Sequence, residues 1–596
     1  MNIIYILTIV LMITLHILLH KKQEKQSLLK WTIISIIMFL CYNIFICVVL
    51  SYLKIPSTLT NLSVINIVVD IIFATKIYKD KKIQKYEISK IDILAVLIMT
   101  IMLIVFMVIQ YGIPLNIKNG ITDASVHFYA ADNFYNYSFL LSEKNSDELN
   151  LWSFQFMMPG AYINTGILFK LFSGIMSETY FYKLYFIFDA FIWLLSGILM
   201  YILLSKNKEG KQKILPLIFS LVYMLGYPLN SLISGFSYLS VGLNIIIAIL
   251  IVMQEQINKY YKYILIFLLN IGIFFSYYFF APVVYLAMFL QIIADIKIKN
   301  EKLFKLENIL NILFTLIIPG FFGILYFIVF QKIKFGGTPN YSNIINIDGS
   351  IYSNLITNIL IFLLLSIFYI IYCIKNKKQE MSNKMFILNI IFVITLFIGM
   401  KLNKVSEYYY YKTYYLTWIL VIYTGYKGLE QIILKGKKSK IISYIAIIIY
   451  IIGLISALIL KQKLGIFDIY KDNSNEIHSN KTKLVTTDEI EILEYYNSNI
   501  NTSKDNLDTQ TYMGITLRDA RAFWIYAITR NPYTYIDLLY GNPTKDLNQF
   551  INIDRKYYVL FKEDYFGDYN QIYMDIEKCN LKILYKNEAG IILEKN

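Results

Sequence analysis

The chain has 596 residues, of which 57% are hydrophobic and 16% are charged, against roughly 25% charged residues in soluble domains. Apolar runs of about 20 residues, the length that crosses a bilayer, recur up to residue 460. The net charge is +15, but the lysines form short clusters between the apolar runs, as in the cytoplasmic loops of membrane proteins. The composition therefore predicts an α-helical polytopic membrane protein and excludes a nucleic-acid partner.

About fourteen apolar runs are predicted to be transmembrane helices. The first lacks the basic start and the small-residue cleavage site of a signal peptide, so we expect it to be retained. The predicted spans are residues 3–19, 31–52, 61–77, 93–111, 182–205, 214–231, 237–254, 262–276, 279–296, 309–331, 353–374, 385–402, 414–433 and 441–460.

The lysine clusters predict the orientation of these spans. With fourteen spans, every cluster falls in an alternate connection and all can be cytoplasmic together, which places both termini outside. The clusters occupy residues 21–25, 76–90, 206–213, 259–262, 297–305, 375–384 and 435–440.

The apolar stretch 152–176 would break this pattern if it crossed the membrane. It contains Pro159-Gly160 and Lys170, which suit an interfacial or re-entrant helix better than a span. We therefore expect it to lie along the outer surface, within a long external loop at 112–180.

The polar tail is predicted to be a small extracytoplasmic α/β domain, large enough to fold by itself. The chain then divides into N-terminal transmembrane helices at 1–92, a transmembrane core at 93–460 and the tail domain at 461–596. Helical patterns in the tail cover 487–496, 517–529 and 569–578, and strand patterns cover 557–561, 581–585 and 591–594.

The external loop carries the first candidate site. If the segment after Thr122 is helical, Asp123 and His127 lie one turn apart on one face. A carboxylate beside an imidazole can act as a general base toward an acceptor hydroxyl. The alternative is that Asp123 caps a surface helix and pairs with His127. Asp132, farther along the segment, is a supporting candidate.

A second candidate site is the tyrosine-rich loop that enters the span at 414–433. Lys412, Lys404 and Tyr411 can donate hydrogen bonds to a phosphate, and Glu407 is a supporting candidate. The alternative is an aromatic belt at the interface with a snorkelling lysine. Weaker phosphate-binding candidates, on the glycine-containing external loop before the eleventh span, are Lys332 and Lys334.

Asp70 and Asp189 fall inside predicted spans, where a carboxylate is costly and faces protein or water. Asp189 is either a supporting residue of the site or a structural carboxylate. No histidine has a partner at metal-ligand spacing, and no nucleotide-binding glycine motif stands between a strand and a helix. The sequence predicts no metal site and no cofactor, and it leaves a divalent-metal requirement open.

Together these features resemble the GT-C superfamily of polytopic, lipid-carrier-dependent glycosyltransferases. The resemblance is carried by Asp123 and His127 in a long external loop, the flat segment 152–176, the loop 407–415 and the extracytoplasmic tail. It covers residues 93–596 in layout. Three helices precede the core, and Asp123 stands alone where many members have paired acids.

The resemblance implies transfer of a sugar from a polyprenyl-phosphate-linked donor to an acceptor on the outer face of the membrane. Asp123 would deprotonate the acceptor, Lys412 or Lys404 would hold the donor phosphate, and the tail would shape the acceptor site. The acceptor would be a cell-surface glycan, lipid or protein.

Two other functions are compatible with the sequence. A flippase for lipid-linked oligosaccharides, or another transporter, also has about this many helices. A non-catalytic envelope scaffold is the second. A composition rich in Ile, Lys, Asn and Tyr is typical of AT-rich bacterial genomes, so we expect the protein in a bacterial plasma membrane.

Overall fold

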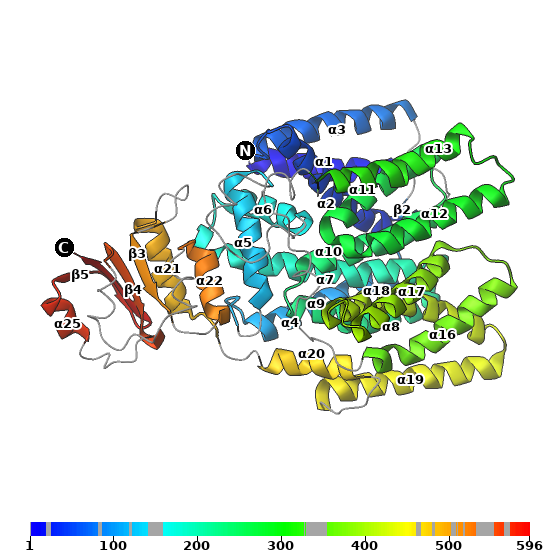
Figure 1. The fold of residues 1–596 in the computed structure, drawn as a ribbon. Helices are drawn as coiled ribbons and strands as arrows, with labels where there is room; N and C mark the ends of the chain where they lie inside the picture. Colours follow the sequence, from blue (N-terminus) through cyan, green and yellow to red (C-terminus); the bar gives the residue numbers. More distant parts are fainter. Residues whose placement is uncertain are drawn as a thin grey trace.

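The computed structural model is a bundle of long apolar helices with a small α/β domain at one end (Figure 1). The structure describes Ile328, Asp508 and residues 2–19, 26–80, 86–118, 122–140, 159–326, 355–460, 467–479, 483–501, 510–515, 519–531, 554–564 and 572–595.

The bundle consists of helices joined mostly by short turns. Its helices are α1 (Asn2–Leu18), α2 (Leu28–Tyr52), α3 (Leu59–Asp80), α4 (Lys90–Tyr111), α5 (Thr122–Tyr137), α6 (Gly160–Phe172), α7 (Phe181–Leu204), α8 (Ile214–Leu225), α9 (Tyr227–Ile233), α10 (Ser237–Met253), α11 (Lys259–Tyr277), α12 (Ala281–Ile298), α13 (Leu306–Ile312), α14 (Ile318–Tyr326), α16 (Leu355–Lys375), α17 (Met381–Lys401), α18 (Glu407–Ile433) and α19 (Lys437–Leu460).

Short elements complete the bundle. A π-helix, η5 (Leu313–Ile317), joins α13 to α14, and a two-residue parallel bridge pairs β1 (Gln26–Ser27) with β2 (Tyr86–Glu87). The 3-10 turns are η2 (Glu178–Tyr180), η3 (Gly210–Lys213) and η4 (Tyr278–Phe280).

The predicted membrane class is confirmed. Within the described residues every predicted apolar run is helical, and ten helical segments are long and apolar enough to cross a membrane. One of the ten, Lys259–Ile298, contains both α11 and α12, whereas α1 and α10 are shorter apolar helices. The number fourteen is not confirmed by these lengths.

Polar contacts join the helix ends that the lysine clusters place on one side. Lys213 Nζ lies 2.8 Å from Asp92 Oδ1 at the start of α4, and Lys30 Nζ lies 2.6 Å from Glu255 Oε2 after α10. These pairs bring together four connections that the sequence predicts to be cytoplasmic, so they agree with the predicted threading.

The segment at 152–176 differs from its prediction where it is described. Helix α6 is almost entirely buried and packs against α2, α5, α7, α10 and α11, so it does not lie along the surface. Lys170 on α6 donates hydrogen bonds to Ser57 O at 2.7 Å and to Ser138 Oγ at 2.9 Å. The lysine is buried because these acceptors satisfy its ammonium group inside the protein.

The tail contains the predicted α/β domain. Its elements are α20 (Asp468–Ser479), α21 (Thr487–Asn499), β3 (Thr511–Gly514), α22 (Asp519–Thr529), β4 (Tyr557–Phe561), η7 (Lys562–Asp564), α25 (Ile572–Lys578), β5 (Leu581–Asn587) and β6 (Gly590–Lys595). The strand order is β3-β4-β6-β5, with β3 parallel to β4 and the other pairs antiparallel. Helix α20 packs against α19 and α9 of the bundle instead of the sheet.

A buried ion-pair triad holds the tail domain together. Arg521 on α22 contacts Glu489 on α21 and Asp564 in η7, each at 2.5 Å, and all three side chains are at most 2% exposed. A buried arginine needs such partners, because its removal from water is compensated only by charged hydrogen bonds. Figure 1 shows α5 and α6 between this domain and the rest of the bundle.

We predict that the tail and the loop around α6 lie outside the cell. In a background free of its four cysteines, Ser173→Cys after α6 and Glu588→Cys in the tail should both react with an impermeant maleimide on intact cells. Lys211→Cys is the control and should react only after permeabilisation. All three positions are exposed. Reaction of Lys211→Cys on intact cells, without the other two, would reverse the orientation.

Candidate active site

The candidate site is built around the first turn of α5. The turn between α9 and α10 lies directly against it: a Cβ on Gly235 would approach Ala124 N and Ala124 Cβ to 2.8 Å. Gly235 also has φ of +73°, a conformation that glycine adopts without steric cost. Glycine at this position therefore allows the start of α5 to approach the N-terminal end of α10.

His127 lies buried behind this first turn. Its Nδ1 is 3.2 Å from the Tyr162 hydroxyl of α6, and its ring centroid is 4.6 Å from that of Tyr238 on α10. Burial lowers the pKa of His127 to about 3, and the Lys412 ammonium adds to this shift. The imidazole is therefore neutral at physiological pH.

Lys412 comes to the same place from α18. Its side chain is 0% exposed, and Nζ lies 3.1 Å from the ring centroid of Phe236 and 4.9 Å from that of Tyr408. Within the described part of the chain Nζ has no hydrogen-bond partner. The sequence predicts that the Lys412 ammonium is accessible, either to a phosphate or to water by snorkelling. This prediction is wrong, because aromatic rings cover the ammonium group.

Asp123 is the exposed member of the group. Desolvation by the surrounding protein raises the pKa of its carboxyl, and the Lys412 ammonium acts against this shift. The hydroxyls of Tyr238 and Tyr408 lie close to each other, and both are within electrostatic range of Asp123. The result is an open carboxylate supported from behind by a buried cation and phenol groups.

The structure thus brings together three of the predicted site residues: Asp123, His127 and Lys412. The lone Asp–His pair that the sequence suggests is replaced by a wider cluster, in which His127 Nδ1 lies within hydrogen-bond distance of the Tyr162 hydroxyl. The arrangement can accept a proton at Asp123 from a group outside the protein.

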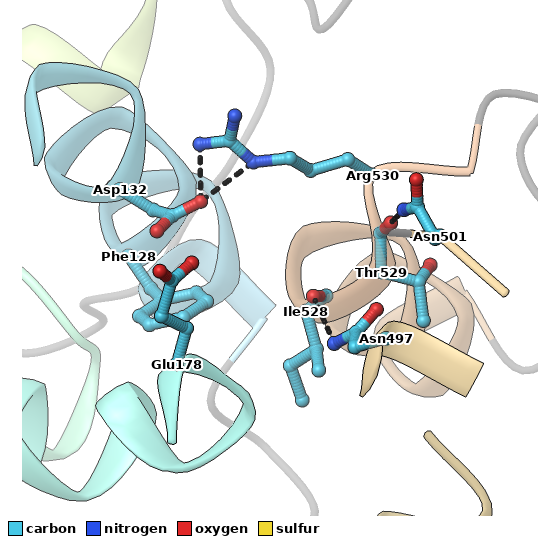
Figure 2. Close-up of a pocket in the computed structure, with 8 residues that line it drawn as sticks. All are labelled: Phe128, Asp132, Glu178, Asn497, Asn501, Ile528, Thr529 and Arg530. Atoms are coloured by element: carbon cyan, nitrogen blue, oxygen red, sulfur yellow. Dashed lines mark hydrogen bonds and ion pairs between the residues drawn. The ribbon is translucent and has the colours of Figure 1, made fainter. Parts of the chain in front are cut away.

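The supporting acids divide between two other environments. Asp132 is buried and receives hydrogen bonds from Arg530 of the tail (Figure 2). Asp189, on α7, is buried beside Tyr185 and Ser237, whose hydroxyl oxygens lie 3.4 Å apart. Asp189 on α7 therefore lies against the first residue of α10.

The remaining predicted residues lie outside the cluster or outside the described residues. Lys404 and Glu407 are exposed at the turn into α18. The ring of Tyr411 packs on Tyr410, with 5.2 Å between ring centroids. The predicted phosphate-binding group is therefore split between a buried Lys412 and an exposed Lys404. Lys332 and Lys334 lie outside the described residues.

Sequence reasoning missed three aromatic residues of the site: Tyr162, Phe236 and Tyr238. Each lies in or beside an apolar stretch, where an aromatic residue is ordinary. The one local signal was Gly235, a glycine in the short outer turn just before Phe236 and Tyr238. Among the described residues, no group of three or more His, Cys, Asp or Glu side chains is arranged to hold a metal ion.

No protein-family model matches the chain, and no curated protein matches it. Among solved structures the chain is similar to the oligosaccharyltransferase AglB from Archaeoglobus fulgidus in complex with an inhibitory peptide and a dolichol-phosphate. The identity is 12%, the TM-score is 0.43, and the match covers 79% of this chain and 69% of that one.

Two further structures of the Archaeoglobus fulgidus oligosaccharyltransferase match equally well. The apo form is 11% identical and the form tethered to an acceptor peptide is 13% identical, both with a TM-score of 0.43 and the same coverage. AglB is a membrane glycosyltransferase of the GT-C superfamily. A TM-score below 0.5 establishes no shared mechanism, so the function of this chain has to follow from its own residues.

The neutral state of His127 predicts a pH-dependent stability. The pKa of His127 is about 3 in the folded protein, against 6.5 ordinarily. Between these values the unfolded chain binds more protons, so stability falls as the pH drops, by up to about 1.4 kcal/mol per pH unit. Because His127→Gln cannot titrate, its melting temperature in detergent should fall less than that of wild type between pH 7 and pH 4.5. Equal losses would show that His127 is not buried as a neutral group.

Proposed function

We propose that the chain is a membrane glycosyltransferase. It transfers a sugar from a polyprenyl-phosphate-linked donor to an acceptor on the outer face of a bacterial plasma membrane, in the assembly of a cell-envelope polysaccharide or glycoconjugate. The observation that carries this proposal is the exposed Asp123 carboxylate, placed at the end of an apolar helix bundle and backed by a buried ammonium group.

The proposed reaction is a displacement at the anomeric carbon of the donor sugar. The acceptor hydroxyl oxygen forms a bond to that carbon while its proton passes to Asp123. The bond between the anomeric carbon and the phosphate oxygen breaks, and polyprenyl phosphate leaves with the electron pair. No nucleotide site is needed, because the leaving group is a lipid phosphate at the headgroup level.

Lys412 and Lys404 take different parts in this proposal. Lys412 is covered by Phe236 and Tyr408, so its charge acts on Asp123 and favours the ionised form that accepts a proton. Lys404 is exposed in the turn that leads into α18 and is the residue we assign to the donor phosphate. His127, neutral and hydrogen-bonded to Tyr162, fixes the inner wall of the site.

The transporter alternative needs charged groups contributed by many helices to a central path. In the described spans few charged side chains are buried, and Asp189 among them lies beside the hydroxyl groups of Tyr185 and Ser237. An open carboxylate at the end of the bundle, next to a docked domain, suits an enzyme better.

The decisive variant is Asp123→Asn, which keeps the shape of the side chain and removes the basic oxygen. Because a general base contributes about 10²–10⁴-fold in rate, transfer should fall by about that factor in protein that still folds, while the melting temperature falls because Lys412 loses its nearby carboxylate. The assay uses purified protein in liposomes with a panel of polyprenyl-phosphate-linked hexoses and an envelope extract as acceptor, and measures released polyprenyl phosphate.

Glu588→Gln is the matched control, because it removes an exposed carboxylate of the tail, in the turn between β5 and β6 and away from the cluster. It should keep wild-type turnover. Wild-type turnover by Asp123→Asn would remove Asp123 as the base. Absence of donor cleavage by the wild-type protein for every sugar in the panel, together with transport of intact donor across the liposome, would favour the transporter.

A further inference from the structure

The tail domain is docked on the helix that carries Asp123. Arg530, directly after α22, donates from Nε to Asp132 Oδ2 at 2.7 Å and again from its terminal guanidinium (Figure 2). The pair is buried: Arg530 is 8% exposed and Asp132 is 6% exposed. Breaking one side of such a pair leaves an uncompensated charge.

Aromatic contacts extend the same interface along α5. The ring of Tyr526 stacks on Tyr129, with 5.4 Å between centroids and 28° between planes. Trp524 lies against Phe128, with 5.6 Å between centroids. A small cavity of about 10 Å³ remains between α5, η2, α21 and α22, enough for roughly one water molecule. The interface is therefore closely packed and holds α5 in one orientation.

The docked face of α5 is opposite to the face of the candidate site. Asp132 follows Asp123 by about two and a half helical turns, which places the two side chains on opposite sides of the helix. Helix α5 thus lies between the tail on one side and the Tyr238 and Lys412 cluster on the other. A rotation or shift of α5 on the tail side moves Asp123 relative to Lys412.

The tail also contacts the chain before α5. Leu484 N donates to Ile117 O at 2.9 Å, and Lys483 and Lys118 form an antiparallel bridge. Tail contacts therefore fix the chain on both sides of Asp123, at Lys118 and at Phe128. The position of the carboxylate between them depends on the tail.

The backbone at Arg530 is set for this contact. Arg530 has φ of +57°, a left-handed conformation that non-glycine residues rarely adopt. The next residue, Asn531, is tied down by hydrogen bonds from its Nδ2 to Thr511 O at 3.1 Å and to the Tyr496 hydroxyl at 3.3 Å. These contacts with the tail domain hold the backbone at Arg530 in the conformation that directs its guanidinium toward Asp132.

We infer that Arg530 is a positioning residue for Asp123. Through its ion pair with Asp132 it fixes α5 and so sets the distance between the Asp123 carboxylate and the Lys412 ammonium group. This inference rests on the proposed function, since it takes Asp123 as the reacting group. It assigns to the tail domain a role in the reaction that does not require contact with the substrate.

Two variants test this role. Arg530→Gln breaks the pair, and Asp132→Asn with Arg530→Gln replaces it by two neutral amides, which removes the unpaired buried charge. The matched control is Ser177→Ala, which removes the 2.6 Å hydrogen bond from Ser177 to Glu494 and so weakens the docking of the tail at η2 without touching α5.

The first readout needs no substrate. Hydrogen–deuterium exchange of a peptide covering α5 should rise at least severalfold in Arg530→Gln and in the double variant. Exchange of α10 should stay as in wild type, and Ser177→Ala should leave α5 unchanged. Unchanged exchange of α5 in Arg530→Gln would overturn the inference, whatever the enzyme does.

The second readout is donor cleavage in the liposome assay. A displacement of a reacting group by about 1 Å costs about 10²-fold in rate, so kcat should fall by ten- to a hundredfold in both variants with KM for the donor within threefold. The double variant should regain the melting temperature of wild type without regaining kcat. Recovery of kcat together with stability would reduce Arg530 to a structural role.

The two proposals fail in different ways. If Asp123→Asn keeps wild-type turnover, the proposed function fails. If Asp123→Asn loses turnover while Arg530→Gln keeps it, only the positioning role of Arg530 fails.

Discussion

The arrangement of the site depends on one charge: the ammonium group of Lys412, buried among aromatic rings and without a hydrogen-bond partner in the described part of the chain. A charge in such a place is costly. Cation–π attraction to the ring faces offsets part of the free-energy cost of burying the ammonium, and Coulomb attraction to a nearby carboxylate offsets more. Burial lowers the pKa of Lys412 well below its ordinary value, and the Asp123 carboxylate opposes this shift and favours the charged ammonium. This charge pair stabilises the approach of α18 to α5 at the end of the bundle, although the two helices are far apart in sequence.

That meeting requires close approach of three chain segments. Gly235 lets the first turn of α5 lie against the turn before α10, and α6 places the Tyr162 hydroxyl beside His127. Lys170 fixes the far end of α6 to Ser57 and Ser138. Helices α5 and α6, the described helices between the fourth and fifth predicted spans, therefore pack closely on each other, and α22 of the tail packs against α5.

The spans could be predicted because hydropathy reports length and apolarity directly. The tail strands at 557–561, 581–585 and 591–594 were predicted for a similar reason, since their apolar residues suit a sheet core. Strand β3 was missed because it has four residues and no clear alternation. Hydropathy does not separate a helix buried in protein from one lying at the membrane surface, so the burial of α6 among other helices was not predicted.

Asp123, His127 and Lys412 were predicted as separate groups, and the structure shows them together. Spacing along one helix relates Asp123 to His127, but nothing local relates either to Lys412, almost 300 residues away. The same limit explains Asp132. Its partner, Arg530, lies in the tail almost 400 residues away, so no local pattern indicates that this acid serves the domain interface.

The central claim is that Lys412 acts through Asp123. A double-mutant cycle with Asp123→Asn, Lys412→Met and the combined variant, measured as donor cleavage in liposomes, tests it most directly. If the two residues form one functional unit, the combined variant will be no slower than Asp123→Asn alone, with a coupling energy above about 1 kcal/mol. Losses that add, so that the combined variant is slower by the product of the single effects, would contradict the account.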